Sequence, residues 1–205
     1  MGVLILHAYA LYSELKGWQS GIGSLLGFIA LMVGALWNFR LNRRRDAALR
    51  AEEVVSVAAA LYGEIALLRI EAANIARAVA NAFLAEGIRF DTHFLSAHQI
   101  SEPMLYKALA SKLGILPADL IIGITEFYSH IQQLKIWLPL LVDNPERGYG
   151  YGPTCVLIPA RDAVFDVDPT LRYIERICGM RNTAQPVNLG AAEGVIDMEE
   201  HTHAS

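Results

Sequence analysis

The first half of the sequence lacks proline, since all eight prolines of this 205-residue chain lie at or after Pro103. Proline removes a backbone donor and breaks helices, so the first half can form long uninterrupted helices and the second half must be divided into shorter ones. The alternation of polar and apolar residues that is typical of strands is almost absent. The sequence therefore predicts an all-α protein.

The chain also has few cysteines and no net positive charge. The only two cysteines, Cys155 and Cys178, do not form a CxxC pair, and we interpret them as small hydrophobic residues rather than as a redox or metal site. The formal net charge is −4, which excludes the basic footprint of a dedicated nucleic-acid-binding protein. We expect no nucleic-acid partner.

Charged residues are missing from the 23 residues at positions 17–39. About 20 apolar residues suffice to cross the ~30 Å hydrocarbon core of a bilayer, and a helix satisfies its own backbone hydrogen bonds there. Trp18 and Trp37 stand near the two ends, where amphipathic rings suit the headgroup region. The run predicts one transmembrane helix. The apolar stretch at residues 3–12 is too short to span, and we expect it to lie at the outer interface or to extend the anchor helix.

Basic residues follow this run at once and predict its orientation. Lys and Arg resist translocation, so the arginine-rich side should face the cytoplasm, where it can also meet anionic lipid headgroups. A cleaved signal peptide is disfavoured, because the first 13 residues carry no basic side chain and arginines replace a cleavage site. We expect the inner (plasma) membrane of a bacterial cell, given a composition rich in Ala, Leu and Arg, with the N-terminus outside. The basic border consists of Arg40, Arg43, Arg44 and Arg45.

Small residues recur along one face of the predicted anchor. They step by three and four residues and stay within an arc of roughly 80° at 3.6 residues per turn. Such a face lets two backbones approach closely, which drives helix association in lipid. We expect self-association, or pairing with another membrane helix, through Ser20, Gly23, Gly27, Ala30 and Gly34.

A second long helix is predicted from the arginines to about Gly87, and with no proline between them the anchor can continue directly into it. Its apolar residues keep a heptad, which is the spacing of a coiled-coil seam. The seam can pair with a second copy or with later helices of the same chain, and its width favours the latter. The seam is Ala47, Ala51, Val54, Ala58, Leu61, Ile65, Leu68, Ala72, Ile75, Val79 and Ala82, and the expected solvated positions are Glu52, Glu53, Glu64, Arg69, Glu71, Asn74 and Arg77.

Shorter helices are predicted downstream. We expect helices over residues 102–113 with Ser101 as N-cap, over 118–142 with a kink or an end at Pro139, and over 159–179 with an interruption at Asp168. Residues 87–100 and 143–154 are expected to be loops, and 188–198 a short helix. The predicted divisions are a short outer segment at 1–16, a transmembrane helix at 17–39, a cytoplasmic antiparallel bundle of about four helices at 40–180, and an acidic, partly disordered tail at 181–205.

Candidate chemical groups are few, and none has a diagnostic pattern. Glu126 and His130 share a helix face, but their spacing differs from the Glu-x-x-His pairs of di-iron bundles, and we expect a local surface pair. The glycines at 148, 150 and 152 lack the GK[ST] ending of a phosphate-binding loop. Neither cysteine lies in a catalytic signature, and the tail histidines His201 and His203 lack neighbouring ligands. The sequence predicts no catalytic, cofactor or metal residues, with Asp91, His93 and His98 interpreted as loop residues.

We interpret the protein as a non-enzymatic, single-pass membrane protein. Its cytoplasmic helical module would bind or assemble with an unknown protein partner, and the lipid bilayer and a second copy would be its other partners. An alternative is a membrane-acting effector of the lysis or cell-suicide type, whose bundle senses a trigger. A membrane-tethered metal-dependent enzyme is a third hypothesis.

Overall fold

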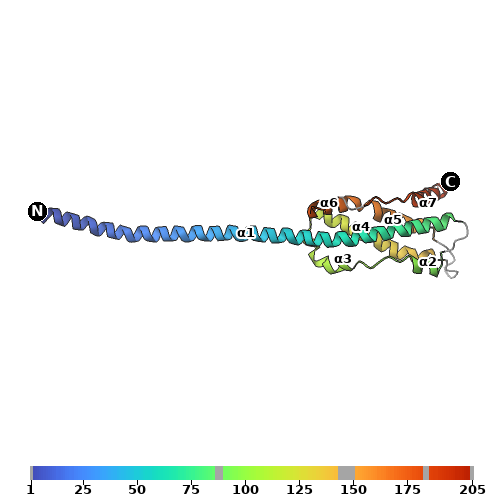
Figure 1. Cartoon of the computed structure of the whole chain (residues 1–205), viewed down its shortest axis with the longest axis horizontal. Coiled ribbons are helices and arrows are strands. Elements are labelled where there is room, and N and C mark those ends of the chain that lie inside the picture. The colour runs from blue at the N-terminus through green and yellow to red at the C-terminus, as the bar shows by residue number, and fades with distance from the viewer. Residues whose placement is uncertain (1, 86–89, 143–150, 182–184, 204–205) are drawn as a thin grey trace. The chain divides into compact units, whose positions relative to one another are not determined.

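The structure is a computed structural model that describes residues 2–85, 90–142, 151–181 and 185–203, with the backbone alone described for residues 2–11, 13–15, 19–20 and 202–203. Within these ranges the regular elements are all helices, as the sequence predicted (Figure 1). In chain order they are α1 (Gly2–Leu84), α2 (Thr92–Ala97), α3 (Met104–Leu109), η1 (Ala110–Ile115), α4 (Ala118–Trp137), η2 (Leu138–Leu141), α5 (Thr154–Phe165), α6 (Asp168–Cys178) and α7 (Gly190–His203), where η denotes a 3₁₀ helix.

Helix α1 is 83 residues long and covers both the apolar run and the heptad segment. The absence of proline before Pro103 allows this continuity. The apolar stretch at residues 3–12 also belongs to α1, as an extension of the helix. The chain divides into two compact units, Met1–Ala51 and Glu52–Ser205, and α1 contributes residues to both.

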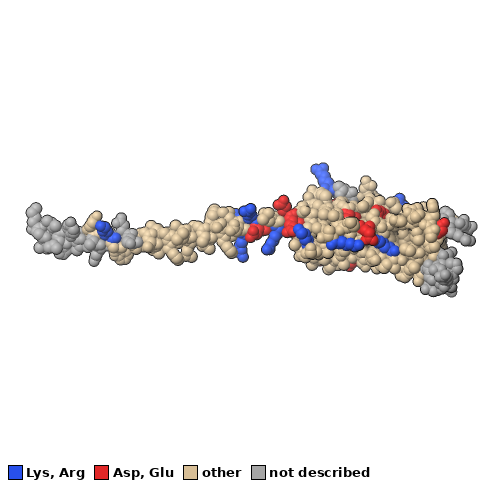
Figure 2. All heavy atoms as spheres, turned by 90° about the horizontal axis from the view of Figure 1, so that it is seen from below, with Lys and Arg blue, Asp and Glu red and all other residues tan. Residues whose placement is uncertain are grey.

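The first unit consists of the amino-terminal part of α1. Of the helices described, α1 is the one that is long and apolar enough to cross a membrane, over a stretch within Lys16–Leu84. None of its most apolar 18-residue window is buried in the structure. Figure 2 shows an uninterrupted stretch without charge, followed by a group of basic and acidic side chains.

The second unit is a helical bundle with one hydrophobic core. Helix α4 packs on α5 and α6, and α5 packs on α7. The predicted seam of α1 is buried in this core from Ala58 to Ala82, whereas Ala47 and Ala51 are exposed. Over residues 58–82, therefore, the seam pairs with later helices of its own chain. Helices α3 and α6 lie towards the end where α1 enters the bundle, and α2 and α7 towards the end where α1 stops (Figure 1).

Two local predictions between residues 87 and 116 are corrected. The predicted loop contains α2, because Asp91 acts as its N-cap and accepts a hydrogen bond from the Phe94 amide at 2.7 Å. Ser101 caps no helix. Its amide and hydroxyl instead donate to the Glu71 carboxylate at 2.8 and 2.7 Å, and α3 starts after Pro103.

The remaining helix boundaries follow proline and glycine. Helix α4 ends at Trp137 and η2 follows from Leu138, next to Pro139, so the helix ends there instead of continuing to residue 142. Helix α5 starts at Thr154, earlier than predicted, and holds Pro159 in its interior. The predicted interruption falls just before Asp168, and α6 ends at Gly179, whose φ of 63° favours glycine.

The carboxy-terminal helix α7 belongs to the packed bundle. It packs on α5, and the side chains that it and its first flanking residue bury are Leu189, Ala192, Val195 and Ile196. The packed core therefore extends beyond residue 180 into the segment that the sequence assigned to a tail. Among the described residues, α7 adds a fifth α-helix to the core formed with α1, α4, α5 and α6.

Candidate functional site

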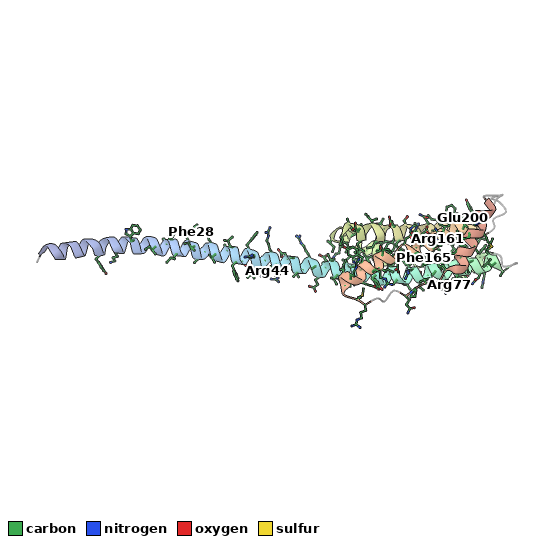
Figure 3. All side chains as sticks on the ribbon, turned by 90° about the horizontal axis from the view of Figure 1, so that it is seen from above. Phe28, Arg44, Arg77, Arg161, Phe165 and Glu200 are labelled. Atoms are coloured by element: carbon green, nitrogen blue, oxygen red, sulfur yellow. The ribbon has the colours of Figure 1, made fainter. Side chains whose placement is uncertain are left out.

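The small-residue face of the apolar run in α1 is open. Gly23, Gly27, Ala30 and Gly34 are exposed, and a Cβ added at any of the three glycines would meet no atom within 4 Å. Ser20 lies on α1, but its side chain is outside the described part. The surrounding side chains are exposed too, including Phe28 at 61% (Figure 3). Among the described residues, nothing packs against this face.

The four basic residues that border the apolar run are also exposed. The Arg43 guanidinium lies 5.1 Å from the centroid of the Phe39 ring, which is a cation–π distance. This contact joins the last aromatic residue of the apolar run to the basic border that follows it. Figure 3 labels Arg44, which follows one residue later on α1. An exposed arginine group beside an apolar segment is suited to the headgroup region of an anionic bilayer.

The candidate polar residues on α4 do not form the pair that the sequence predicted. Glu126 is exposed, and His130 approaches Asp166 with a distance of 3.9 Å between Nε2 and the carboxylate. The spacing of four residues placed Glu126 and His130 on one face, but the end of α5 brings a different carboxylate closer. The predicted local pair is thus replaced by a contact between α4 and the residue after α5.

The other candidate groups lie apart from one another. His98 stacks on Phe94 with a centroid distance of 4.4 Å, and its Nδ1 is 2.9 Å from the Phe94 carbonyl oxygen. The Nδ1 atom of His201 is 2.6 Å from the Asp197 carbonyl oxygen. The described ranges hold no group of three or more His, Cys, Asp or Glu side chains that could bind a metal. Gly148, Gly150 and the His203 side chain lie outside the described residues, and Gly152 and His93 are exposed.

Both thiols are partly buried and free. Burial, with a contribution from the Glu199 carboxylate, raises the pKa of the Cys155 thiol to about 11. Burial also raises the pKa of the Cys178 thiol, whose Sγ lies 3.7 Å from the Val55 carbonyl oxygen. A raised pKa keeps a thiol protonated at neutral pH and lowers its reactivity as a nucleophile.

Two α1 residues that were predicted to be solvated are buried, and this prediction is wrong. Glu64 is 9% exposed and accepts hydrogen bonds from the Leu105 and Tyr106 amides at 2.6 and 2.9 Å. The Tyr128 hydroxyl donates to the same carboxylate at 2.6 Å, and burial together with this bond raises the Tyr128 pKa. Glu64 therefore fixes the start of α3 and one residue of α4 to α1.

Arg69 is the second buried polar residue of α1, at 5% exposure. It donates to the carbonyl oxygens of Val164 and Gln185 at 2.8 and 3.1 Å, and to Asp168 Oδ1 at 3.2 Å. Burial lowers the pKa of this guanidinium more than the Asp168 charge raises it. Arg69 thereby ties α1 to the ends of α5 and α6 and to the segment before α7.

A groove opens beside Arg69 on the bundle surface. Its volume is about 610 Å³, and it runs between α1, α6 and residues 185–188. Its walls are mainly apolar, with arginine and amide groups among them. The lining includes Tyr62, Arg69, Ile70, Arg77, Leu171 and Val187.

The sequence carried a partial signal for these residues. Glu64 and Arg69 each stand next to a seam residue, Ile65 and Leu68, at positions that a wide buried stripe also covers. Their partners lie 41 to 116 residues away along the chain, so spacing alone could not identify them.

Comparison with protein-family models, with curated proteins and with solved structures found no match to this chain. Its function has to be inferred from the residues and contacts above.

Proposed function

We propose that the protein is a single-pass membrane protein whose cytoplasmic helical bundle serves as an interaction or assembly module. In this proposal α1 crosses the inner membrane within residues 17–39, with the N-terminus outside. Two copies associate through the small-residue face of the anchor. The bundle at residues 52–205 then meets its protein partner as part of an assembled pair.

The exposure of large apolar side chains along α1 carries the proposal. Thirteen such side chains between Trp18 and Leu41 are 47–75% exposed. Complete burial of a large apolar side chain is worth roughly 1.5–3 kcal/mol, so leaving thirteen in water costs on the order of 20 kcal/mol. A bilayer removes this cost over a segment of the required length.

The basic border supports the orientation. Arg40, Arg43, Arg44 and Arg45 are all exposed after the apolar run, while Lys16 is the one basic residue before it. This asymmetry favours a cytoplasmic bundle. The open glycine face supports self-association, because close backbone approach is what a second anchor helix requires.

The oligomeric state of the full chain in lipid nanodiscs tests the self-association. We expect the wild-type chain to dimerise and the double variant Gly23→Leu, Gly27→Leu to shift towards monomer, because leucine side chains hold the two backbones apart. Gly21→Leu is the matched control, since Gly21 is equally open but lies about 140° round the helix from the small-residue face. A monomeric wild-type chain, or equal effects of the two replacements, would contradict the proposal.

A further inference from the structure

The groove beside Arg69 has the size and lining of a small-molecule site. Its volume of about 610 Å³ lies within the range of ligand pockets, roughly 300–1,000 Å³. Ile70, Leu171 and Val187 supply apolar surface, and Ile70 is 52% exposed. Such pockets combine apolar walls with a few polar groups that orient the ligand.

The polar groups at this groove carry an excess of positive charge. Arg69 and Arg172 both approach the Asp168 carboxylate, at 3.2 and 3.7 Å. The Glu175 carboxylate accepts from Arg172 at 3.0 Å and from the Tyr62 hydroxyl at 2.8 Å. Among the described residues that line the groove itself, the charged ones are Arg69 and Arg77.

Arg77 is placed to meet a ligand. It lies on α1 towards the end of the helix and is exposed (Figure 3). Its Nη2 donates to Asn74 Oδ1 at 2.6 Å and its Nε to the Ala73 carbonyl oxygen at 3.3 Å, which holds the guanidinium against the helix beside the groove. A planar guanidinium held in this way suits a carboxylate or phosphate group.

We propose that this groove binds a small amphipathic anion, a carboxylate or phosphate head joined to an apolar body. The head contacts Arg77 and the apolar body lies against Ile70, Leu171 and Val187. The ligand is a soluble molecule of this chemistry.

Hydrogen–deuterium exchange of the full chain in phosphatidylcholine nanodiscs tests the site, with octanoate as the probe. We expect saturable protection of residues 185–189 and of α1 near Ile70 by octanoate, and none by octanol, which has the same chain without the charge. Arg77→Gln should weaken octanoate binding at least tenfold, since a charge-assisted contact is lost. Arg161→Gln changes a partly exposed arginine that does not line the groove, and it should leave octanoate binding unchanged (Figure 3).

A second variant and a second lipid test the apolar wall of the groove and the source of the anion. Ile70→Asp should abolish protection by placing a negative charge in the groove. Protection by phosphatidylglycerol in the nanodiscs without octanoate would contradict a soluble ligand. No protection by octanoate, equal protection by octanol, or undiminished binding in Arg77→Gln would also overturn the proposal.

Discussion

At the scale of single residues, Gly123 decides how closely α4 and α6 approach. A Cβ at this position would collide with the hydroxyl of Thr170, which is buried on α6. We predict that Gly123→Ala destabilises the bundle by about 1–3 kcal/mol, the usual cost of overpacking. Chemical unfolding of the full chain, followed by circular dichroism, measures this change.

A matched replacement on α1 isolates the effect of crowding. Gly63 is also helical, but an added Cβ would meet nothing within 4 Å. Gly63→Ala should stabilise the chain by about 0.5–1 kcal/mol, because alanine favours a helix over glycine. Equal shifts for Gly123→Ala and Gly63→Ala would show that Thr170 does not restrict the contact.

The thiol of Cys155 gives a prediction on pH. Because burial raises the pKa of this thiol from its usual value of 9.0 to about 11, the thiolate fraction at pH 8 falls roughly a hundredfold. We expect alkylation of Cys155 by iodoacetamide at pH 8 to be slower by about this factor than alkylation of the urea-unfolded chain. The rate should keep rising about tenfold per pH unit up to pH 10. Mass spectrometry of the cysteine peptide measures it, and equal rates for folded and unfolded chains would rule out the raised pKa.

At the scale of elements, the segment from α2 to η1 is held to the bundle by the carboxylates of α1. Helices α2, α3 and η1 bury no residue completely. Pro103 provides no side-chain cap for α3, so Glu64 supplies the acceptor for its first amides. Glu71 binds Ser101, and Glu53 accepts from Lys112 at 2.9 Å.

Replacing Glu64 should therefore loosen this segment selectively. Glu64→Gln removes the charge that strengthens three hydrogen bonds, and we expect a loss of about 1–3 kcal/mol. Amide exchange in residues 101–115 should become faster while exchange in α5 stays unchanged. Glu52→Gln, at an exposed carboxylate on the same helix, is the control. Unaltered exchange in residues 101–115 would mean that Glu64 does not hold the segment.

The elements also show what could be predicted from the sequence. The buried seam from Ala58 to Ala82 followed from heptad spacing, because one apolar face of a helix repeats locally. The end of α4 next to Pro139 and the end of α6 next to Gly179 followed from the backbone limits of those two residues. Each of these signals lies within a few residues of the feature that it predicts.

The features that could not be predicted from the sequence depend on local caps or on contacts between distant residues. Helix α2 is six residues long and depends on its Asp91 cap rather than on periodicity. The burial of Glu64 and Arg69 depends on partners in α3, α4, α5 and the segment before α7. A charged residue beside an apolar seam is solvated unless such partners exist, so the default expectation was wrong for both. The groove, which is lined from three separate segments, could not be predicted for the same reason.

At the scale of the whole molecule, charge separates an uncharged helical segment from a charged bundle. Residues 17–39 carry no charge, whereas the bundle places its charged groups on its surface or in paired contacts (Figure 2). This distribution is what a protein shared between a bilayer and water requires. The proposed function therefore requires above all that α1 spans the membrane with the bundle in the cytoplasm.

Cysteine labelling in intact bacterial cells tests that claim most directly. Tyr12→Cys and Ser111→Cys, both at exposed positions, are introduced separately into a chain carrying Cys155→Ser and Cys178→Ser. We predict that a membrane-impermeant maleimide labels the cysteine of Tyr12→Cys in intact cells, and that of Ser111→Cys only after permeabilisation. Labelling of Ser111→Cys in intact cells, or recovery of the chain in the soluble fraction, would contradict the account.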